Sequence, residues 1–335
     1  MTEDFDLEAI TGTFDTSSIR IYNSYFVSTR IISCIKTTIN FCCELGLIRL
    51  DRTCSRCRKP CKLVKEKRKE DARFPLTFRC YNRKCILYNR YLSIRSGTFF
   101  EGAHIWVQEV ILMASIFCFG KYDYESLIYQ CNIRDDETLL STRSISDWLT
   151  FFREVCIFAV CDHTNGKIGG PGLVVEVDEA KFGKRKSNVG RIVDGQWVVG
   201  GICRETQDVF LVPCPENRRI AICLLNIIQN NINPGSIIIT DCWKGYDSLT
   251  ESGWNHYTVN HSYNFIDPNS GAHTQNIESL WWQVKRSLPD THTRKDGHLI
   301  YHFGEFLYRR KFFTDMPKSL LTFLKHAAEL YPPPI

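Results

Sequence analysis

The sequence predicts an α/β fold whose sheet mixes antiparallel and parallel strands, preceded by a cysteine-rich basic module and a helical region. After residue 170, β-branched runs alternate with helical patterns, whereas cysteines and basic residues concentrate earlier in the chain. A length of 335 residues is sufficient for two or three domains. The expected parts are an N-terminal helical region (1–50), the basic module (51–100), a second helical region (101–162), the α/β domain (171–316) and a C-terminal tail (317–335).

The composition is that of a globular protein, with 44% hydrophobic and 24% charged residues. The longest apolar stretch, WVQEVILMASIFCFG, is shorter than the roughly 18–20 residues that cross a bilayer, and it contains Glu109. The acidic N-terminus lacks the basic region of a secretory signal. We therefore expect an intracellular protein with no membrane partner, in which the 16 cysteines are reduced or bind metal.

Positive charge is concentrated in residues 51–100, which hold 15 Lys and Arg against 4 Asp and Glu, a net charge of +11. The rest of the chain carries a net charge of −6. A local basic segment is typical of proteins that bind a phosphate backbone, although a solvated basic loop has the same composition.

Helical spacing of apolar residues occurs on both sides of the basic module. Residues 15–48 are expected to be mostly helical, and further helices are expected over 104–119, 122–131 and 144–160. Ser and Thr at 141–144 offer helix caps. The apolar face of the last helix consists of Ile145, Trp148, Leu149, Phe152 and Val155. Two helices joined by a polar loop are compatible with a helix-turn-helix, but any helical hairpin has this pattern.

A Gly/Pro-rich segment, HTNGKIGGPG (163–172), marks the clearest domain boundary, and strands follow it. The expected strands are GLVVEVDEAKF, a hairpin of QWVVGGICRE and TQDVFLVPCP, then PGSIIITD and NHYTVN. The expected helices include ENRRIAICLLNIIQNNI and HTQNIESLWWQVKR (273–286). This alternation predicts the mixed α/β sheet.

Four cysteines of the basic module have the spacing of a zinc site. CSRC contains Cys54 and Cys57, and CYNRKC contains Cys80 and Cys85, with 22 residues between the two pairs. Such pairs can place four thiolates tetrahedrally around Zn²⁺, although the second pair is more widely spaced than usual and Cys61 is a further candidate. So charged a segment has little core of its own, which favours a structural zinc ion over unligated thiols.

Three carboxylates form a second candidate metal site. Asp178 and Asp241 lie at or near the ends of predicted strands, where ligand sites of α/β sheets form. Glu278 lies beside the apolar stripe of the helix 273–286. Taken alone, a glutamate in this position is ordinarily a solvent-exposed residue at the edge of the buried face. Converging carboxylates repel one another unless a cation lies between them, and oxygen ligands suit Mg²⁺ or Mn²⁺. Two such ions can activate a water or a 3′-hydroxyl for in-line attack on phosphate.

Several motifs, in this order, resemble those of the Merlin-type DDE transposases and their bacterial insertion-sequence relatives: VVEVDEAKFGKRK, QWVVGGICRETQDVFLVP, IIITDCWKGY and VNHSYNFIDPNSGAHTQNIESLWWQVKR. The resemblance covers most of the chain, from about residue 50, through CSRC…CYNRKC and SIRSGTFFEG, to GEFLYRRKF near residue 312. It implies a ribonuclease-H-like catalytic core in which Asp178, Asp241 and Glu278 bind the divalent ions. It also implies a zinc-ribbon-like module on the four cysteines and a helical DNA-binding region ahead of the core.

Further candidates surround these residues. Some bacterial relatives use asparagine as the third ligand, which makes Asn276 an alternative to Glu278. His261 and His273 flank the third carboxylate and could support the metal ligands or touch a phosphate, the alternative being ordinary loop positions. The positively charged candidates for DNA contacts, for which a solvated charge run is the alternative, are Lys181, Lys184, Arg185, Lys186 and Arg143.

The resemblance predicts a DNA transposase that binds transposon ends and catalyses metal-dependent phosphodiester hydrolysis and strand transfer. Alternatives are a host-adopted, transposase-derived DNA-binding protein without catalysis, and a nuclease or resolvase on the same fold. Expected partners are double-stranded DNA, as terminal repeats and target, and further copies of the chain in a dimer or larger assembly. The expected location is the nucleus if the source is eukaryotic, which the likeness to Merlin-type elements favours, and otherwise the cytoplasm. KLVKEKRK (62–69) is a candidate import signal.

Overall fold

The computed structural model describes residues 10–65, 76–120, 122–133, 139–164, 166–183, 195–259, 273–289 and 298–335. The chain divides into two compact units: unit 1 is Met1–Phe158 with Phe312–Ile335, and unit 2 is Ala159–Lys311. No helix in the described part of the chain combines the length and the apolar character that a membrane crossing requires.

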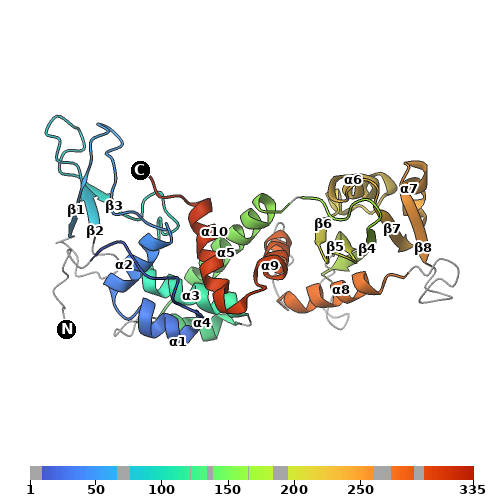
Figure 1. The fold of residues 1–335 in the computed structure, drawn as a ribbon, viewed down its shortest axis with the longest axis horizontal. Helices are drawn as coiled ribbons and strands as arrows, with labels where there is room; N and C mark the ends of the chain where they lie inside the picture. Colours follow the sequence, from blue (N-terminus) through green and yellow to red (C-terminus); the bar gives the residue numbers. More distant parts are fainter. Residues whose placement is uncertain are drawn as a thin grey trace. The chain divides into compact units, whose positions relative to one another are not determined.

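Unit 1 contains helices and a small antiparallel sheet (Figure 1). Its helices are α1 (Ser24–Phe26), a π-helical turn (Val27–Ile31), α2 (Ile35–Glu44), α3 (Val107–Phe119), α4 (Tyr124–Cys131), α5 (Thr142–Asp162, which continues into unit 2) and α10 (Ser319–Leu330). The sheet has the strand order β1 (Lys62–Lys65), β2 (Leu76–Arg79), β3 (Tyr91–Ser93). Residues 10–23 contain no helix, so the helical expectation for 15–48 applies only from residue 24 onward.

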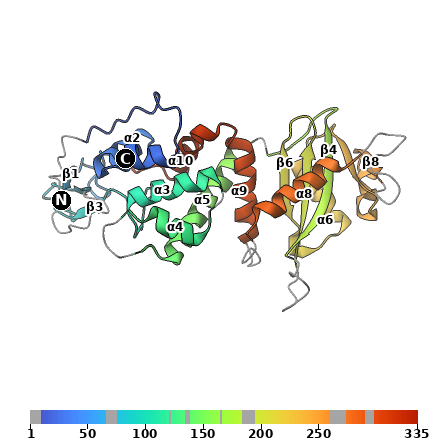
Figure 2. The same cartoon turned by 90° about the horizontal axis from the view of Figure 1, so that it is seen from below.

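An aromatic cluster joins three helices of unit 1. The ring centroid of Phe117 on α3 lies 5.3 Å from that of Phe152 on α5 and 5.5 Å from that of Phe323 on α10, and all three side chains are fully buried. Figure 2 shows α3, α5 and α10 running close together. Residues 317–335, expected as a tail, thus contain a helix that closes the core of unit 1, because its apolar face packs on α3 and α5.

The helix α5 follows the sequence pattern closely. All five apolar residues of its predicted face are buried. At its start, the backbone N–H of Ser144 donates to the hydroxyl oxygen of Ser141 at 3.1 Å, which is the expected N-cap.

Unit 2 contains the predicted mixed sheet. Its strands are β4 (Val174–Phe182), β5 (Gln196–Cys203), β6 (Val209–Pro213), β7 (Ile237–Asp241) and β8 (Asn255–Val259), in the order β6-β5-β4-β7-β8. The pairs β6-β5 and β5-β4 are antiparallel, and β4-β7 and β7-β8 are parallel. The α/β prediction with antiparallel and parallel parts is therefore confirmed.

Helices cover both faces of this sheet (Figure 1). Val175 and Val177 of β4 pack in the core beneath α6 (Ala221–Asn231), whereas Ala180 and Phe182 pack in the core beneath α8 (Gln275–Ser287). Because successive side chains of a strand alternate between faces, Glu176 and Asp178 share the face of Ala180 and are directed toward α8. The central strand therefore brings two carboxylates to the α8 face. The remaining helices of this unit are α7 (Asp247–Glu251) and α9 (His298–Phe312).

The Gly/Pro-rich segment 163–172 is tied into unit 2. The backbone N–H of Ile168 donates to the carbonyl of Asn231 at 2.8 Å, and the N–H of Asn233 donates to the carbonyl of Ile168 at 2.9 Å. These hydrogen bonds attach Ile168 to the end of α6 in unit 2. The division between the two units therefore lies earlier than the Gly/Pro-rich segment, within α5.

Candidate active site and cysteine cluster

The parallel pairing of β4 and β7 directs the two predicted aspartates to the same face of the sheet. The register pairs Glu176 with Ile239, where the ladder of paired residues ends, and Asp178 and Asp241 each lie two residues further along their strands. Paired residues point to the same face of a sheet, and so do residues two positions apart in one strand. The charge of Asp241 acts on Asp178. Asp241 is the last residue of β7, and both aspartates are partly buried.

Glu278 approaches the aspartates from α8. It is exposed and lies in the first turn of this helix, whose apolar residues Ile277, Leu280 and Trp281 are buried on the sheet. The pKa of Asp178 is raised, chiefly by burial, and the negative charges of Asp241 and Glu278 raise it further. The three carboxylates therefore act on one another electrostatically.

The donor set fits a hard divalent cation. It consists of carboxylate oxygens that repel one another, and a cation between them would relieve this repulsion. Within the described residues, the ligand atoms of Asp178, Asp241 and Glu278 do not all lie within 4.8 Å of one another. Binding of one cation by all three residues would accordingly require a change in side-chain positions that brings these ligand atoms closer together.

Two tryptophans orient the aspartates. The indole Nε1 of Trp281 donates to Oδ2 of Asp178 at 3.0 Å, and the backbone N–H of Trp243 donates to Oδ1 of Asp241 at 3.1 Å. The ring of Trp281 lies against Gly200, the residue of β5 that pairs with Asp178. A Cβ at position 200 would lie 2.5 Å from Cη2 of Trp281, so only glycine lets the indole lie this close to the strand.

Gly200→Ala is therefore expected to lower the free energy of unfolding by about 1–3 kcal/mol, because the added methyl group collides with Trp281 and makes a tight contact with Leu211. The matched control is Gly170→Ala, since a Cβ at Gly170 meets only Leu173 Cδ1 at the ordinary distance of 3.7 Å. Chemical denaturation of both variants measures the difference. Equal stabilities would show that Trp281 does not rest on Gly200.

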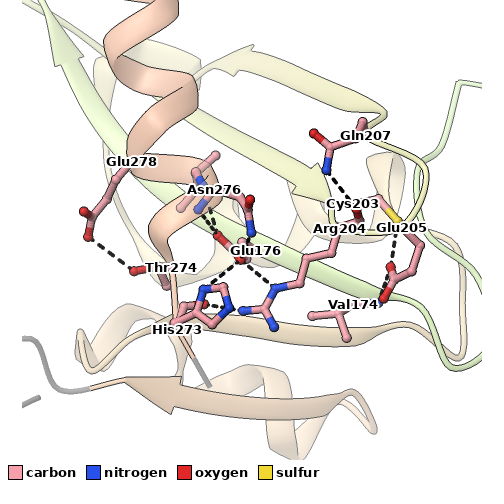
Figure 3. Close-up of polar contacts among 11 residues, drawn as sticks. Val174, Glu176, Cys203, Arg204, Glu205, Gln207, His273, Thr274, Asn276 and Glu278 are labelled. Carbon is pink, nitrogen blue, oxygen red and sulfur yellow. Dashed lines mark hydrogen bonds and ion pairs between the residues drawn. The ribbon is translucent and has the colours of Figure 1, made fainter. Parts of the chain in front are cut away.

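Glu176 is a site residue that the sequence analysis did not select. Figure 3 shows that Asn276 and His273, two predicted candidates, lie against its carboxylate. Nδ2 of Asn276 donates to Oε1 of Glu176 at 2.7 Å, and Nδ1 of His273 lies 3.5 Å from the same oxygen. The available signal was a charged residue within the apolar run LVVEVD, two positions before Asp178 and so on the same face of the strand.

Glu179 is a second such residue, directed to the opposite face of the sheet. Burial, followed by the charges of Asp178 and Asp241, raises its pKa to about 7. The Tyr246 hydroxyl lowers this pKa. Arg219 also lowers it, and its guanidinium lies between two indole rings.

The basic candidates are only partly described. The ammonium of Lys181 lies 5.5 Å from the ring centroid of Trp197, and Arg143 is exposed in the first turn of α5. The remaining basic candidates lie outside the described residues: Lys184, Arg185 and Lys186. The candidate histidine His261 and residues 66–69 of the candidate import signal also lie outside them.

In unit 1, the structure brings the four predicted zinc ligands together. The sulfur atoms of Cys54, Cys57, Cys80 and Cys85 all lie within 4.8 Å of one another. The Sγ–Sγ distance is 3.7 Å between Cys54 and Cys85 and 3.6 Å between Cys57 and Cys80. Cys61 packs beside the cluster but is not one of the four. Four sulfurs at this spacing fit tetrahedral Zn²⁺.

The surroundings of the cluster lower the pKa values of Cys54 and Cys57 and raise those of Cys80 and Cys85. Hydrogen bonds from Asn82 and from the backbone N–H of Lys59 lower the pKa of Cys57 to about 6. The backbone N–H of Asn82 lowers the pKa of Cys80, but burial and the neighbouring sulfurs outweigh it and raise that pKa to about 12. The four sulfurs thus resist carrying four negative charges, a repulsion that a bound cation would relieve.

Comparison with known proteins identifies the family of this chain. The model of the ISXO2-like transposase domain matches residues 169–311, which lie within unit 2 and include the three carboxylates. A protein of Haemophilus influenzae described as an "Uncharacterized transposase-like protein" is 30% identical over 102 residues, which are 30% of this chain and 80% of that protein. The chain therefore belongs to a transposase family, with an ISXO2-like transposase domain in unit 2.

Proposed function

We propose that the protein is a DNA transposase that hydrolyses phosphodiester bonds at transposon ends and joins the freed 3′-hydroxyl to target DNA. Asp178, Asp241 and Glu278 would hold two divalent cations, Mg²⁺ or Mn²⁺. The observation that supports this proposal is the register of β4 and β7, which directs Asp178 and Asp241 to the face covered by the helix of Glu278, together with the effect of the Asp241 and Glu278 charges on Asp178. The matching transposase domain supports it.

The chain's own contribution would be the placement of charge. When bound, the cations would neutralise charge on the phosphate and activate the attacking water or 3′-hydroxyl. The strands direct the two aspartates to one face of the sheet, and Trp281 fixes the orientation of the Asp178 carboxylate through its indole N–H. The backbone N–H of Trp243 does the same for Asp241.

The other parts would bind DNA. The zinc-ribbon-like module and the helical region, including Arg143 of α5, would recognise the terminal repeats, while Lys181 and the basic residues after it would follow the DNA backbone. Two DNA ends must be handled together, so we propose a homodimer or larger assembly on DNA. The mixed sheet supports a ribonuclease-H-like core. The sequence resemblance is the ground for proposing the Merlin type, and a nuclear location is proposed if the source is eukaryotic.

A cleavage assay tests this function. The zinc-loaded full chain is incubated with a plasmid carrying the DNA that flanks its own gene, with Mg²⁺, with Mn²⁺ or with a chelator. Metal-dependent nicking followed by strand joining supports the transposase. Nicking without joining would instead favour a nuclease or resolvase, and specific binding without nicking would favour a DNA-binding protein that has lost catalysis. Nicking in the presence of the chelator would contradict the metal mechanism.

A further inference from the structure

Glu176 is a fully buried carboxylate in the central strand of unit 2, and its two oxygens accept four hydrogen bonds (Figure 3). Oε2 accepts from the backbone N–H groups of Asn276 at 2.9 Å and Ile277 at 3.0 Å. Oε1 accepts from Nδ2 of Asn276 at 2.7 Å and from Nε of Arg204 at 2.6 Å. A buried charge is tolerated only with partners of this kind, and here most of them come from the start of α8.

These contacts cap α8 from a distant part of the chain. The first N–H groups of a helix have no partner within the helix, and the side chain of the N-cap residue Thr274 makes no capping hydrogen bond. The Glu176 carboxylate takes this role, and its negative charge also suits the positive end of the helix dipole. The start of α8 is thereby fixed to β4.

Arg204 ties a third segment into this arrangement. Its Nη2 donates to the carbonyl oxygen of His273 at 2.6 Å, while its Nε donates to Glu176. Its own backbone N–H donates to the carbonyl of Val174 at the start of β4. One guanidinium thus holds both the capping carboxylate and the residue that leads into α8.

Glu278 lies between two attachments of α8 to β4. Its backbone N–H closes the first turn on the carbonyl of Thr274 at 3.2 Å, immediately after the residues held by Glu176. One turn further on, Trp281 donates to Asp178. Glu176 and Asp178 share one face of the same strand, so the two attachments together set the position of Glu278 relative to the aspartates.

We propose that Glu176, supported by Arg204, is a positioning residue for the third carboxylate: it fixes the first turn of α8 on β4 and so places Glu278 beside Asp178 and Asp241. This inference rests on the proposed metal-binding function. Glu176 acts through Asn276 and Ile277, and the Asn276 side chain is part of this attachment. Glutamine at position 176 would present an amide donor to groups that are themselves donors, so at least one N–H would lose its acceptor.

The test is Mn²⁺ binding by the zinc-loaded full chain, followed through the electron paramagnetic resonance signal of free Mn²⁺. Glu176→Gln is expected to weaken Mn²⁺ binding by roughly 10–100-fold, the usual effect of losing a residue that orients a metal ligand. Because the ligands themselves remain, saturating Mn²⁺ should restore binding. The matched control is Glu205→Gln, since Glu205 is exposed, accepts from the N–H of Val174 and lies in the same turn as Arg204. It should bind Mn²⁺ like the wild type.

Arg204→Lys is the milder variant if Glu176→Gln does not fold. Lysine keeps the positive charge but lacks the planar guanidinium that donates to both the Glu176 carboxylate and the His273 carbonyl. It should weaken Mn²⁺ binding less and speed hydrogen exchange at residues 275–280. A variant that folds and binds Mn²⁺ like the wild type would overturn the positioning role alone, even if its melting temperature fell. A wild-type protein that binds no Mn²⁺ would overturn the proposed metal site and this inference together.

Discussion

Asp178→Asn is expected to reduce metal-dependent DNA cleavage by roughly 10³-fold or more while leaving the protein folded. A metal ion in such a site supplies several kcal/mol of transition-state stabilisation, and each 1.36 kcal/mol is about a factor of ten in rate. The asparagine oxygen can still accept the hydrogen bond from Trp281. The matched control is Asp247→Asn, an exposed aspartate at the start of α7 in the same unit. Cleavage by Asp178→Asn at the wild-type rate would contradict the assignment.

The same substitution has a predicted effect on stability. In the folded protein, burial and the charges of Asp241 and Glu278 raise the pKa of Asp178 above its ordinary value of 3.8. The folded state therefore binds the proton more tightly than the unfolded state, and stability falls as the pH rises through the window above 3.8. Asparagine carries no charge, so at pH 7 without divalent metal the variant should melt no lower than the wild type.

With added Mg²⁺ or Mn²⁺, the wild type should melt at a higher temperature than Asp178→Asn. A ligand that binds only the folded state stabilises it, so the metal should raise the melting temperature of the wild type and not that of Asp178→Asn. Thermal denaturation at pH 7 and below pH 3.8, with and without metal, measures both effects. A wild type more stable than the variant in the absence of metal would contradict the electrostatic explanation.

Cys57→Ser is expected to remove the zinc ion and to unfold the module of β1, β2 and β3. The cysteines form an apolar cluster of their own, with Leu87 packed against them, beside the buried Leu76 and Phe78 of β2. In zinc-finger peptides the metal contributes about 10–16 kcal/mol of apparent binding free energy, which becomes folding free energy. Wild-type protein should contain one Zn²⁺ per chain, and the variant close to none.

Cys61→Ser is the matched control, because Cys61 packs beside the cluster without belonging to the four-sulfur set. It should retain its zinc. Elemental analysis gives the stoichiometry, and hydrogen exchange over residues 54–65 and 76–93 shows whether the module has unfolded. Wild-type protein without stoichiometric zinc would end the structural zinc assignment, and zinc loss in Cys61→Ser would show that the ligand set is different.

Local patterns predicted unit 2 well because its strands are short β-branched runs separated by turn residues. The N-terminal part was predicted less well, since apolar spacing in residues 10–23 reflects packing of an irregular segment and not a helix. The helix α10 was assigned to a tail because its partners, α3 and α5, come from far earlier in the chain. A pattern of apolar residues shows which face is buried but not what covers it.

The site residues differ in the same way: some could be predicted from local sequence and others depend on distant parts of the chain. Asp241 could be selected because it ends β7, as the sequence predicts. Asp178 was selected as a residue near a strand end, but that expectation was wrong, since β4 continues to Phe182 and Asp178 lies in its middle. Glu176 was missed, because its partners Asn276 and Ile277 lie about 100 residues away in the chain. Gly200 was missed for a similar reason, since its need for glycine arises only where the ring of Trp281 packs on β5.

Mn²⁺ binding to the zinc-loaded full chain tests most directly whether Asp178, Asp241 and Glu278 form a divalent-metal site. Wild-type protein should bind Mn²⁺, and Asp178→Asn and Asp241→Asn should each lose this binding, because each removes a charged ligand from a site that depends on all three. Asp247→Asn should bind Mn²⁺ like the wild type. Undiminished Mn²⁺ binding by Asp241→Asn would contradict the assignment of these carboxylates.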